Sequence, residues 1–168
     1  MRAAIRDMPD FPVPGILFRD ITPLLADAAV FREATDALAA PFVDAGITHV
    51  AGIESRGFIL AAPVAQRLRA GFVPIRKRGK LPGPTVRAKY GLEYGTDELE
   101  LHRDAFPTGS RVLIVDDVLA TGGTALASAS LVEQAGGAVT GFSFLVLLQA
   151  LQGAARLESF AVQALLRL

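Results

Sequence analysis

The chain has 168 residues, enough for one domain with a substantial core, and its 51% apolar and 20% charged residues exclude a disordered chain. Its 17 basic and 17 acidic residues balance, so no global charge favours nucleic acid or an anionic membrane as a partner. The sequence has no cysteine, no apolar run of the ~18 residues that a membrane span needs and no signal peptide, so we expect a cytoplasmic protein without thiolate chemistry.

Short apolar runs alternate with helical patterns along most of the chain. The proline-rich residues 1–25 are predicted to form a small hood over the edge of a sheet. Strand–helix–strand order predicts an α/β fold, a parallel sheet flanked by helices, with ligands beyond the carboxyl ends of its strands. The predicted helices are Phe31–Ala45, Phe58–Ala70 and Thr124–Ala135, the last two ending at glycine caps, Gly71 and Gly136. The predicted strands are His49–Ile53, Phe72–Ile75, Val112–Val115 and Phe142–Leu148, with a last strand-like stretch at Phe160–Leu166.

Residues 77–106 break this alternation. Lysine, proline and glycine crowd into 77–84, and two short alternating segments, near 85–90 and 98–102, follow. This pattern predicts a β-hairpin arm with a mobile tip, outside the core of the sheet. We therefore expect a single domain, 1–168, that carries a hood and an arm.

Residues 112–124 hold the motif that says most about function. Four apolar residues run into Asp116 and Asp117, and a loop of small residues, 120–124, then opens a helical pattern. Glycines in such a loop let backbone N–H groups approach a phosphate, and the helix N-terminus adds partial positive charge. Two carboxylates at the end of a buried strand are costly without partners, and a ribose diol supplies them. The motif favours a sugar-phosphate site over an ordinary strand–turn–helix with acidic capping residues.

Several blocks of the chain resemble the adenine phosphoribosyltransferases, a family of type I phosphoribosyltransferases that bind phosphoribosyl pyrophosphate (PRPP). The resemblance covers roughly residues 8–150 and implies the type I phosphoribosyltransferase fold. It also implies purine salvage, in which the 5-phosphoribosyl group of PRPP passes to adenine and gives AMP and pyrophosphate. Besides the motif above, the matching blocks are residues 11–24, 52–58, 76–85 and 92–95, in the family's order.

The motif chemistry and the resemblance together assign site residues. The assigned catalytic residues are Glu93, Asp116 and Asp117. The ribose and 5′-phosphate are assigned to Asp116, Asp117, Ala120, Thr121, Gly122, Gly123 and Thr124. Pyrophosphate is assigned to Glu54, Ser55, Arg56, Lys77, Lys80 and Tyr94, and adenine to Leu17, Phe18 and Arg19. The resemblance further implies a cis peptide bond near Glu54-Ser55.

Some of these assignments have a simpler alternative. Four cations lie within Arg76–Lys80, which is usually a solvated stretch, but here the run follows a strand at the sheet edge that also carries Arg56. By resemblance, Glu93 is a general acid near the N7 side of the purine on a closing lid; otherwise it is an exposed hairpin residue. Phe18 either stacks on the base or belongs to the core.

The expected cofactor is Mg²⁺, held mainly by PRPP, with Asp116 and Asp117 as candidate contacts and no separate metal site. The resemblance implies a homodimer, and no nucleic-acid or membrane partner is predicted. Three alternatives stay open: an enzyme for another purine base, a regulator that binds PRPP without turnover, and a degenerate paralogue.

The C-terminal part departs from the family. Leu147 stands where adenine enzymes commonly carry a glutamate, and Gly153 and Arg156 are more widely spaced than the usual Gly-Arg pair. These changes concern the base pocket or a dimer contact rather than the PRPP residues.

Overall fold

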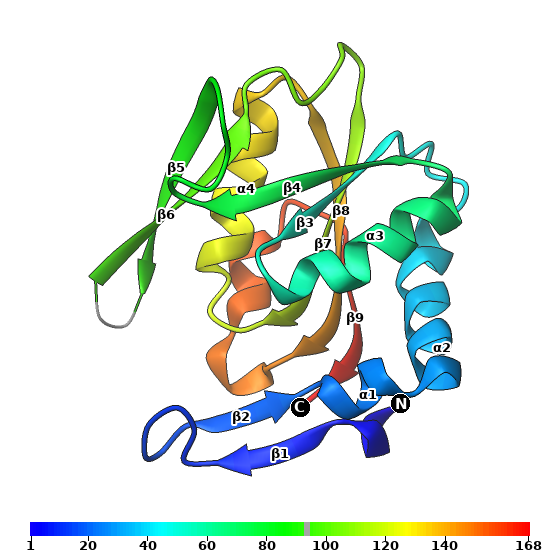
Figure 1. Ribbon diagram of the computed structural model, residues 1–168, viewed down its shortest axis with the longest axis vertical. Helices are drawn as coiled ribbons and strands as arrows, with labels where there is room; N and C mark the ends of the chain where they lie inside the picture. The colour runs from blue at the N-terminus through cyan, green and yellow to red at the C-terminus, as the bar shows by residue number, and fades with distance from the viewer. Residues whose placement is uncertain (93–94) are drawn as a thin grey trace.

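The computed structural model describes residues 1–92 and 95–168. Seven strands form one sheet in the order β5-β6-β4-β3-β7-β8-β9 (Figure 1). The five strands from β4 to β9 in that order are parallel. Beyond β4, β6 pairs antiparallel with β4, and β5 pairs antiparallel with β6. The strands are β3 (His49–Ile53), β4 (Gly71–Lys77), β5 (Thr85–Leu92), β6 (Gly95–His102), β7 (Arg111–Leu119), β8 (Ala138–Leu147) and β9 (Val162–Arg167). The predicted parallel α/β sheet is confirmed.

Helices cover both faces of the sheet because its central strands are apolar on both sides. On β7, Val112 and Ile114 pack toward α4, whereas Leu113 and Val115 pack toward α2 and α3. The α-helices are α1 (Thr22–Ala26), α2 (Ala28–Ala39), α3 (Arg56–Leu68) and α4 (Gly123–Gln134). Short 3₁₀ turns are η1 (Arg2–Ala4), η2 (Ala40–Phe42), η3 (Gln149–Leu151) and η4 (Gly153–Leu157). None of the helices in 1–92 and 95–168 is both long enough and apolar enough to span a membrane.

Two of the predicted helices have other boundaries than expected. The first helix begins earlier because the Asp27 carboxylate accepts the N–H groups of Ala29 and Val30, and it turns into η2 before Pro41. The second helix does not end at a glycine cap: Arg69 takes the left-handed conformation, with φ of 55°. Gly71 instead begins β4, where a Cβ atom would lie 3.0 Å from the His49 ring. The predicted left-handed glycine at Gly136 is confirmed, with φ of 88°.

The hairpin arm was predicted, but its place was not. β5 and β6 pair from Thr85 and His102 to Leu92 and Gly95. β6 also pairs with β4, through Arg76 opposite Glu100 and Lys77 opposite Leu99, so the base of the arm belongs to the sheet. Buried Leu99 anchors it in the core on the α4 side.

The N-terminal hood consists of an antiparallel ribbon, β1 (Arg6–Pro9) and β2 (Leu17–Asp20), followed by α1. It lies beyond the carboxyl ends of the parallel strands, at the bottom of Figure 1. Buried Ile5, Ile21 and Leu24 join it to the core on the α2 and α3 side. The hood therefore covers the end of the sheet where ligands are expected.

Candidate functional site

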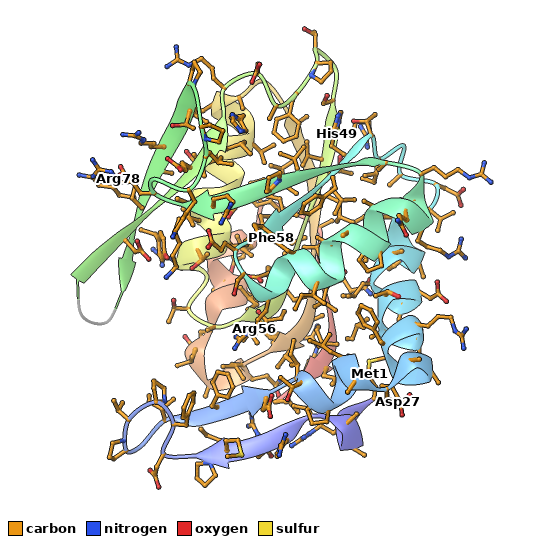
Figure 2. All side chains as sticks on the ribbon, in the orientation of Figure 1. Met1, Asp27, His49, Arg56, Phe58 and Arg78 are labelled. Carbon is orange, nitrogen blue, oxygen red and sulfur yellow. The ribbon has the colours of Figure 1, made fainter. Side chains whose placement is uncertain are left out.

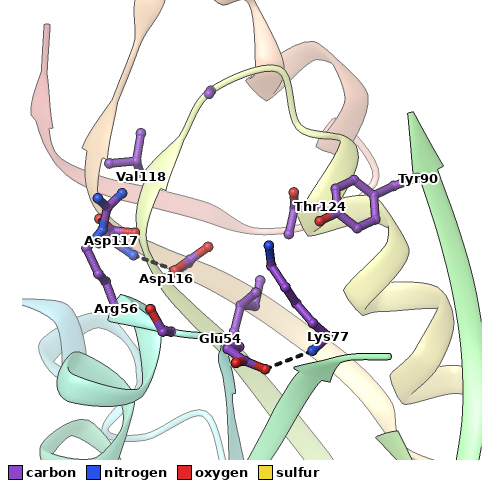
Figure 3. A pocket seen from close by; sticks show the side chains of 11 residues that line it. Glu54, Arg56, Lys77, Tyr90, Asp116, Asp117, Val118 and Thr124 are labelled. Carbon is purple, nitrogen blue, oxygen red and sulfur yellow. Dashed lines mark hydrogen bonds and ion pairs between the residues drawn. The ribbon is translucent and has the colours of Figure 1, made fainter. Parts of the chain in front are cut away.

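A cavity of about 630 Å³ opens at the carboxyl ends of β3 and β7, the position expected for a parallel sheet (Figure 3). It brings together residues that lie far apart in the sequence and that carry opposite charges. Its lining consists of Ile53, Glu54, Ser55, Arg56, Lys77, Tyr90, Asp116, Asp117, Val118, Ala120 and Thr124. Eight of these eleven residues were assigned to the PRPP site from the sequence, and Ile53, Tyr90 and Val118 were not assigned a role.

The two carboxylates lie within β7 rather than after it. The strand was predicted to stop at Val115, but it continues to Leu119 because it stays paired with β8, for example through Val118 and Val146. Since side chains alternate along a strand, Asp116 and Asp117 point to different sides. Asp116 faces the cavity, and Asp117 turns toward Arg56 (Figure 3).

The electrostatics of this pair are asymmetric. Asp117 is 4% exposed, and its Oδ2 lies 2.5 Å from Nε of Arg56. Burial, together with the negative charge of Asp117, raises the pKa of Asp116 well above its ordinary value. The Oδ1 of Asp116 also accepts the N–H of Asp117 at 2.9 Å. Asp117 thus has a cationic partner. The ionised form of Asp116 is disfavoured unless a hydrogen-bond donor or a cation binds to it.

The turn that presents Arg56 depends on close packing against β7. A Cβ atom on Gly57 would lie 2.7 Å from Oδ1 of Asp116 and 3.1 Å from the carbonyl oxygen of Val115. Only glycine at this position lets α3 begin directly beside the carboxylates. The peptide bond Glu54-Ser55 is cis, as the resemblance implied.

Arg56 joins the carboxylates to the hood. Its guanidinium lies 5.1 Å from the centre of the Phe18 ring, close enough for a cation–π contact. Figure 2 shows Arg56 in the space between α3 and the hood. A pocket of about 140 Å³ at this junction is lined by Ile16, Leu17, Phe18, Arg19, Arg56, Val118 and Leu148. The three residues assigned to adenine therefore lie together.

Glu54 and the basic stretch have divided roles. The Glu54 carboxylate accepts hydrogen bonds from Nε of Arg76 at 3.1 Å and from the N–H of Lys77 at 2.9 Å. The hydrogen bond from Arg76 is the main cause of the lowered pKa of Glu54. The Lys77 side chain points into the cavity (Figure 3), whereas that of Lys80 is exposed and does not line it. The sequence grouped these residues, but the structure brings Lys77 and not Lys80 to the site.

The small-residue loop 120–124 begins α4 as predicted. Gly122 is the N-cap of this helix, with φ of 80°, and no side chain caps it. The loop touches three cavities: Ala120 and Thr124 line the largest, Thr121 and Gly122 a small one of about 70 Å³, and Gly123 one of about 300 Å³. The backbone of this loop is consequently accessible from several cavities.

Two contributions to the site were missed in the sequence. Tyr90 lines the main cavity, and its hydroxyl donates to Oδ2 of Asp97 at 3.0 Å. Burial, with the nearby Asp97, raises the pKa of Tyr90 to about 12. Gly153 of η4 packs against the loop: a Cβ atom there would lie 2.1 Å from the carbonyl oxygen of Ala120. No signal along the chain links Gly153 to a loop some thirty residues earlier.

Glu93 and Tyr94, assigned to catalysis and to pyrophosphate, lie outside the described residues. Within 1–92 and 95–168 no group of three or more acidic or histidine side chains could hold a metal ion.

Comparisons with known proteins agree with one another. A family model described as the phosphoribosyl transferase domain matches residues 22–161. An adenine phosphoribosyltransferase of Acidothermus cellulolyticus is 57% identical over 165 residues, which cover 98% of this chain and 93% of that protein. The crystal structure of adenine phosphoribosyltransferase from Rhodothermus marinus matches with a TM-score of 0.95 and 55% identity, over 99% of this chain and 96% of that one. That of the Saccharomyces cerevisiae enzyme, complexed with an imino-altritol bisphosphate and adenine, matches with a TM-score of 0.92 and 40% identity, over 97% and 94%.

Proposed function

This chain belongs to the adenine phosphoribosyltransferases, and from that membership we propose how its cavity binds substrates and supports the reaction. The protein transfers the 5-phosphoribosyl group of PRPP to adenine and forms AMP and pyrophosphate. The observation that carries the proposal is the single cavity in which Arg56 and Lys77, the carboxylate pair and the loop at the start of α4 face one space. These are the three chemistries that pyrophosphate, ribose and a 5′-phosphate require.

The loop 120–124 binds the 5′-phosphate. The free N–H groups of the first turn of α4 and the hydroxyls of Thr121 and Thr124 are donors for a phosphate oxygen. The left-handed Gly122 lets the backbone curve around the anion. Asp116 and Asp117, near the end of β7 just before this loop, accept hydrogen bonds from the ribose hydroxyls.

The pyrophosphate is bound by Arg56, Lys77 and the backbone beside Ser55. Glu54 contributes indirectly, because its N–H donates to Ile75 and its carboxylate already holds Arg76 and the backbone of Lys77. Glu54 therefore orients Arg76 and Lys77 at the end of β4, instead of binding pyrophosphate directly as the sequence predicted. Lys80 reaches the pyrophosphate only if its exposed side chain turns inward on binding.

Adenine lies in the pocket between the hood and β7. The Phe18 ring offers a stacking surface, and the backbone of residues 17–19 offers N–H and C=O groups for the amino group and ring nitrogens of the base. Arg19 is held by an ion pair with Asp7, so it fixes the hood ribbon rather than reaching the base.

The reaction is a displacement at C1 of the ribose without a covalent enzyme intermediate. The bond from C1 to the pyrophosphate oxygen breaks with its electron pair leaving on pyrophosphate, while the purine nitrogen bonds to C1 and its proton passes to solvent. Positive charge on the ribose grows in this loose transition state, and the carboxylates of Asp116 and Asp117 stabilise it. Glu93 serves as the general acid on the N7 side of the purine, and Tyr94 closes with it over the reaction centre and excludes water.

Mg²⁺ fits this donor set, since it favours one or two carboxylates together with substrate phosphate oxygens. Asp116 and Asp117 would hold it, and the bound ion would supply charge neutralisation of PRPP. The homodimer, the cytoplasmic location and the single-domain organisation of residues 1–168 belong to the same proposal.

The decisive test is a product assay with PRPP and Mg²⁺ against adenine, hypoxanthine, guanine, xanthine and orotate. AMP and pyrophosphate formed from adenine alone would support the proposal. Turnover of a different base would support the PRPP site but contradict the proposed adenine pocket. PRPP binding without any product would indicate a regulator or a degenerate paralogue.

A further inference from the structure

The 3₁₀ turn η4 is fixed against the loop that begins α4. Gly153 packs so closely that its Cβ would lie 2.8 Å from the nitrogen of Gly122, and a Cβ on Gly122 would lie 2.6 Å from the carbonyl oxygen of Gly153. At the other end of the turn, Leu157 is fully buried. In Figure 1 the orange segment that contains η4 lies beside the first turn of α4. The backbone of η4 therefore has a defined position relative to the loop.

Arg156 is the cation that this turn presents. Its Nη1 lies 3.5 Å from the point that a Cβ of Gly123 would occupy, and Oγ1 of Thr121 lies 3.9 Å from the same point. Arg156 and Gly123 also line the same cavity of about 300 Å³. Within residues 1–92 and 95–168, no carboxylate lies within ion-pair distance of Arg156. The exposed guanidinium of Arg156 thus lies beside the loop, close to the carbonyl oxygen of Gly91, and no described carboxylate forms an ion pair with it.

A phosphate at this loop needs such a charge. The loop itself provides amides and hydroxyls, and the first turn of α4 holds no acidic residue that would compete with an anion. The nearest functional neighbours, Asp116 and Asp117, are acidic and repel a phosphate dianion. A guanidinium forms charge-assisted hydrogen bonds to phosphate that are roughly twice as strong as neutral ones.

We propose that Arg156 is a further binding residue of this site, whose guanidinium contacts the 5′-phosphate shared by PRPP and AMP. Arg156 thereby makes the site selective for phosphorylated ribose over a free nucleoside. The wider spacing between Gly153 and Arg156 serves this role, because Gly153 contacts the loop and Arg156 stands three residues further along the turn. This inference rests on the proposed placement of the 5′-phosphate at residues 120–124.

The experiment compares the wild type with Arg156→Gln, Arg156→Lys and the control Arg32→Gln. Arg32 is exposed on α2, away from the cavities described above. Dissociation constants are measured by calorimetry for AMP, adenosine, adenine and pyrophosphate, with steady-state kinetics in PRPP and thermal unfolding alongside. Arg156→Gln should weaken AMP roughly 10-fold or more and leave the other three ligands within about twofold. It should raise KM for PRPP with little change in kcat, as expected for an interaction made equally in the ground and transition states.

Arg156→Lys should recover part of the AMP affinity, and Arg32→Gln should match the wild type. Unchanged AMP affinity in Arg156→Gln, with normal AMP synthesis by the wild type, would overturn this inference alone. Equal weakening of AMP and adenosine would also overturn it, because a purely structural role has no preference for the phosphate. A wild type that neither binds nor forms AMP would overturn the proposed site itself, and the role of Arg156 with it.

Discussion

Replacing Gly153 with alanine tests the packing that holds the loop 120–124, the proposed phosphate site, in place. The backbone of Gly153 is not in the left-handed region, so an added methyl group brings no conformational strain of its own. Its effect comes from contact: the Cβ would lie 2.1 Å from the Ala120 oxygen and 2.8 Å from the Gly122 nitrogen. Both atoms belong to backbone and cannot rotate away as a flexible side chain can.

The size of the effect follows from that distance. Contacts of Cβ below 3.0 Å essentially never occur in proteins, so η4 and the loop must separate by at least about 0.9 Å. Overpacking of this kind costs about 1–3 kcal/mol, which for a domain of this size lowers Tm by roughly 2–4 °C per kcal/mol. A misplacement of about 1 Å in a positioning element can lower activity about 100-fold. Gly153→Ala should therefore lose far more activity than its stability loss explains.

The assay measures kcat and KM for PRPP at a temperature well below the unfolding transition of the variant. Ala155→Ser is the matched control, because Ala155 is exposed on the same turn, and it should behave as the wild type. Loss of affinity for AMP with unchanged affinity for adenine would locate the damage at the loop 120–124. If Gly153→Ala keeps wild-type kinetics and Tm, the close contact between η4 and the loop is not a feature of the working enzyme.

Three further substitutions probe the acidic centre and its supports. Asp117→Asn should lower kcat roughly 100-fold while changing stability by less than about 1 kcal/mol, because loss of the ion pair with part-exposed Arg56 is offset by relief of repulsion with Asp116. Asp116→Asn should lower kcat and raise Tm at neutral pH. The folded-state pKa of Asp116 is raised, so its ionised carboxylate destabilises the fold above the ordinary aspartate pKa of about 3.9. Below that pH the gain in Tm from the substitution should vanish. Glu54→Gln should raise KM for PRPP and lower Tm slightly at neutral pH; since the pKa of Glu54 is lowered, that stability difference should disappear as the pH falls through the folded-state pKa.

Thermal unfolding between about pH 3 and pH 8, without substrate, checks the two stability profiles. A gain from Asp116→Asn that grows toward acid would contradict the assigned cause of the pKa shift. A loss from Glu54→Gln that is constant with pH would show that its ion pair with Arg76 contributes nothing. For Asp117→Asn, a large stability loss with normal turnover would remove the catalytic assignment.

The parts of the fold that the sequence predicted are those with a clear local pattern. The run of five residues His49–Ile53 is β3 to the residue, because a short apolar segment between turns has no competing helical period. The end of β7 was misplaced for a physical reason. Two adjacent aspartates are typical of a loop, but here the backbone stays paired with β8 past both of them. Their carboxylates line the cavity and so avoid the apolar core.

Long-range contacts explain what the sequence could not predict at the site. The choice between Lys77 and Lys80 depends on how β4 ends beside β6, where buried Glu100 accepts the N–H groups of Lys80 and Leu81 at 2.8 Å. This carboxylate fixes the backbone of the basic turn and leaves the Lys80 side chain at the surface. Leu147, which departs from the family, is 5% exposed in the core on the α4 side, where it needs no polar partner.

With PRPP placed as proposed, the charge arrangement of the cavity separates binding from catalysis. A substrate that carries a phosphate and a pyrophosphate would be bound most tightly by a uniformly basic cavity, yet its centre holds Asp116 and Asp117. Their repulsion of the anionic ground state is limited by Arg56, which neutralises one of them, and by the loop amides and Lys77 at the ends of the cavity. In the proposed mechanism the same carboxylates attract the ribose once it becomes cationic, so their stabilisation acts mainly in the transition state. Substitution of the peripheral cations should therefore raise KM for PRPP, whereas substitution of the central carboxylates should lower kcat.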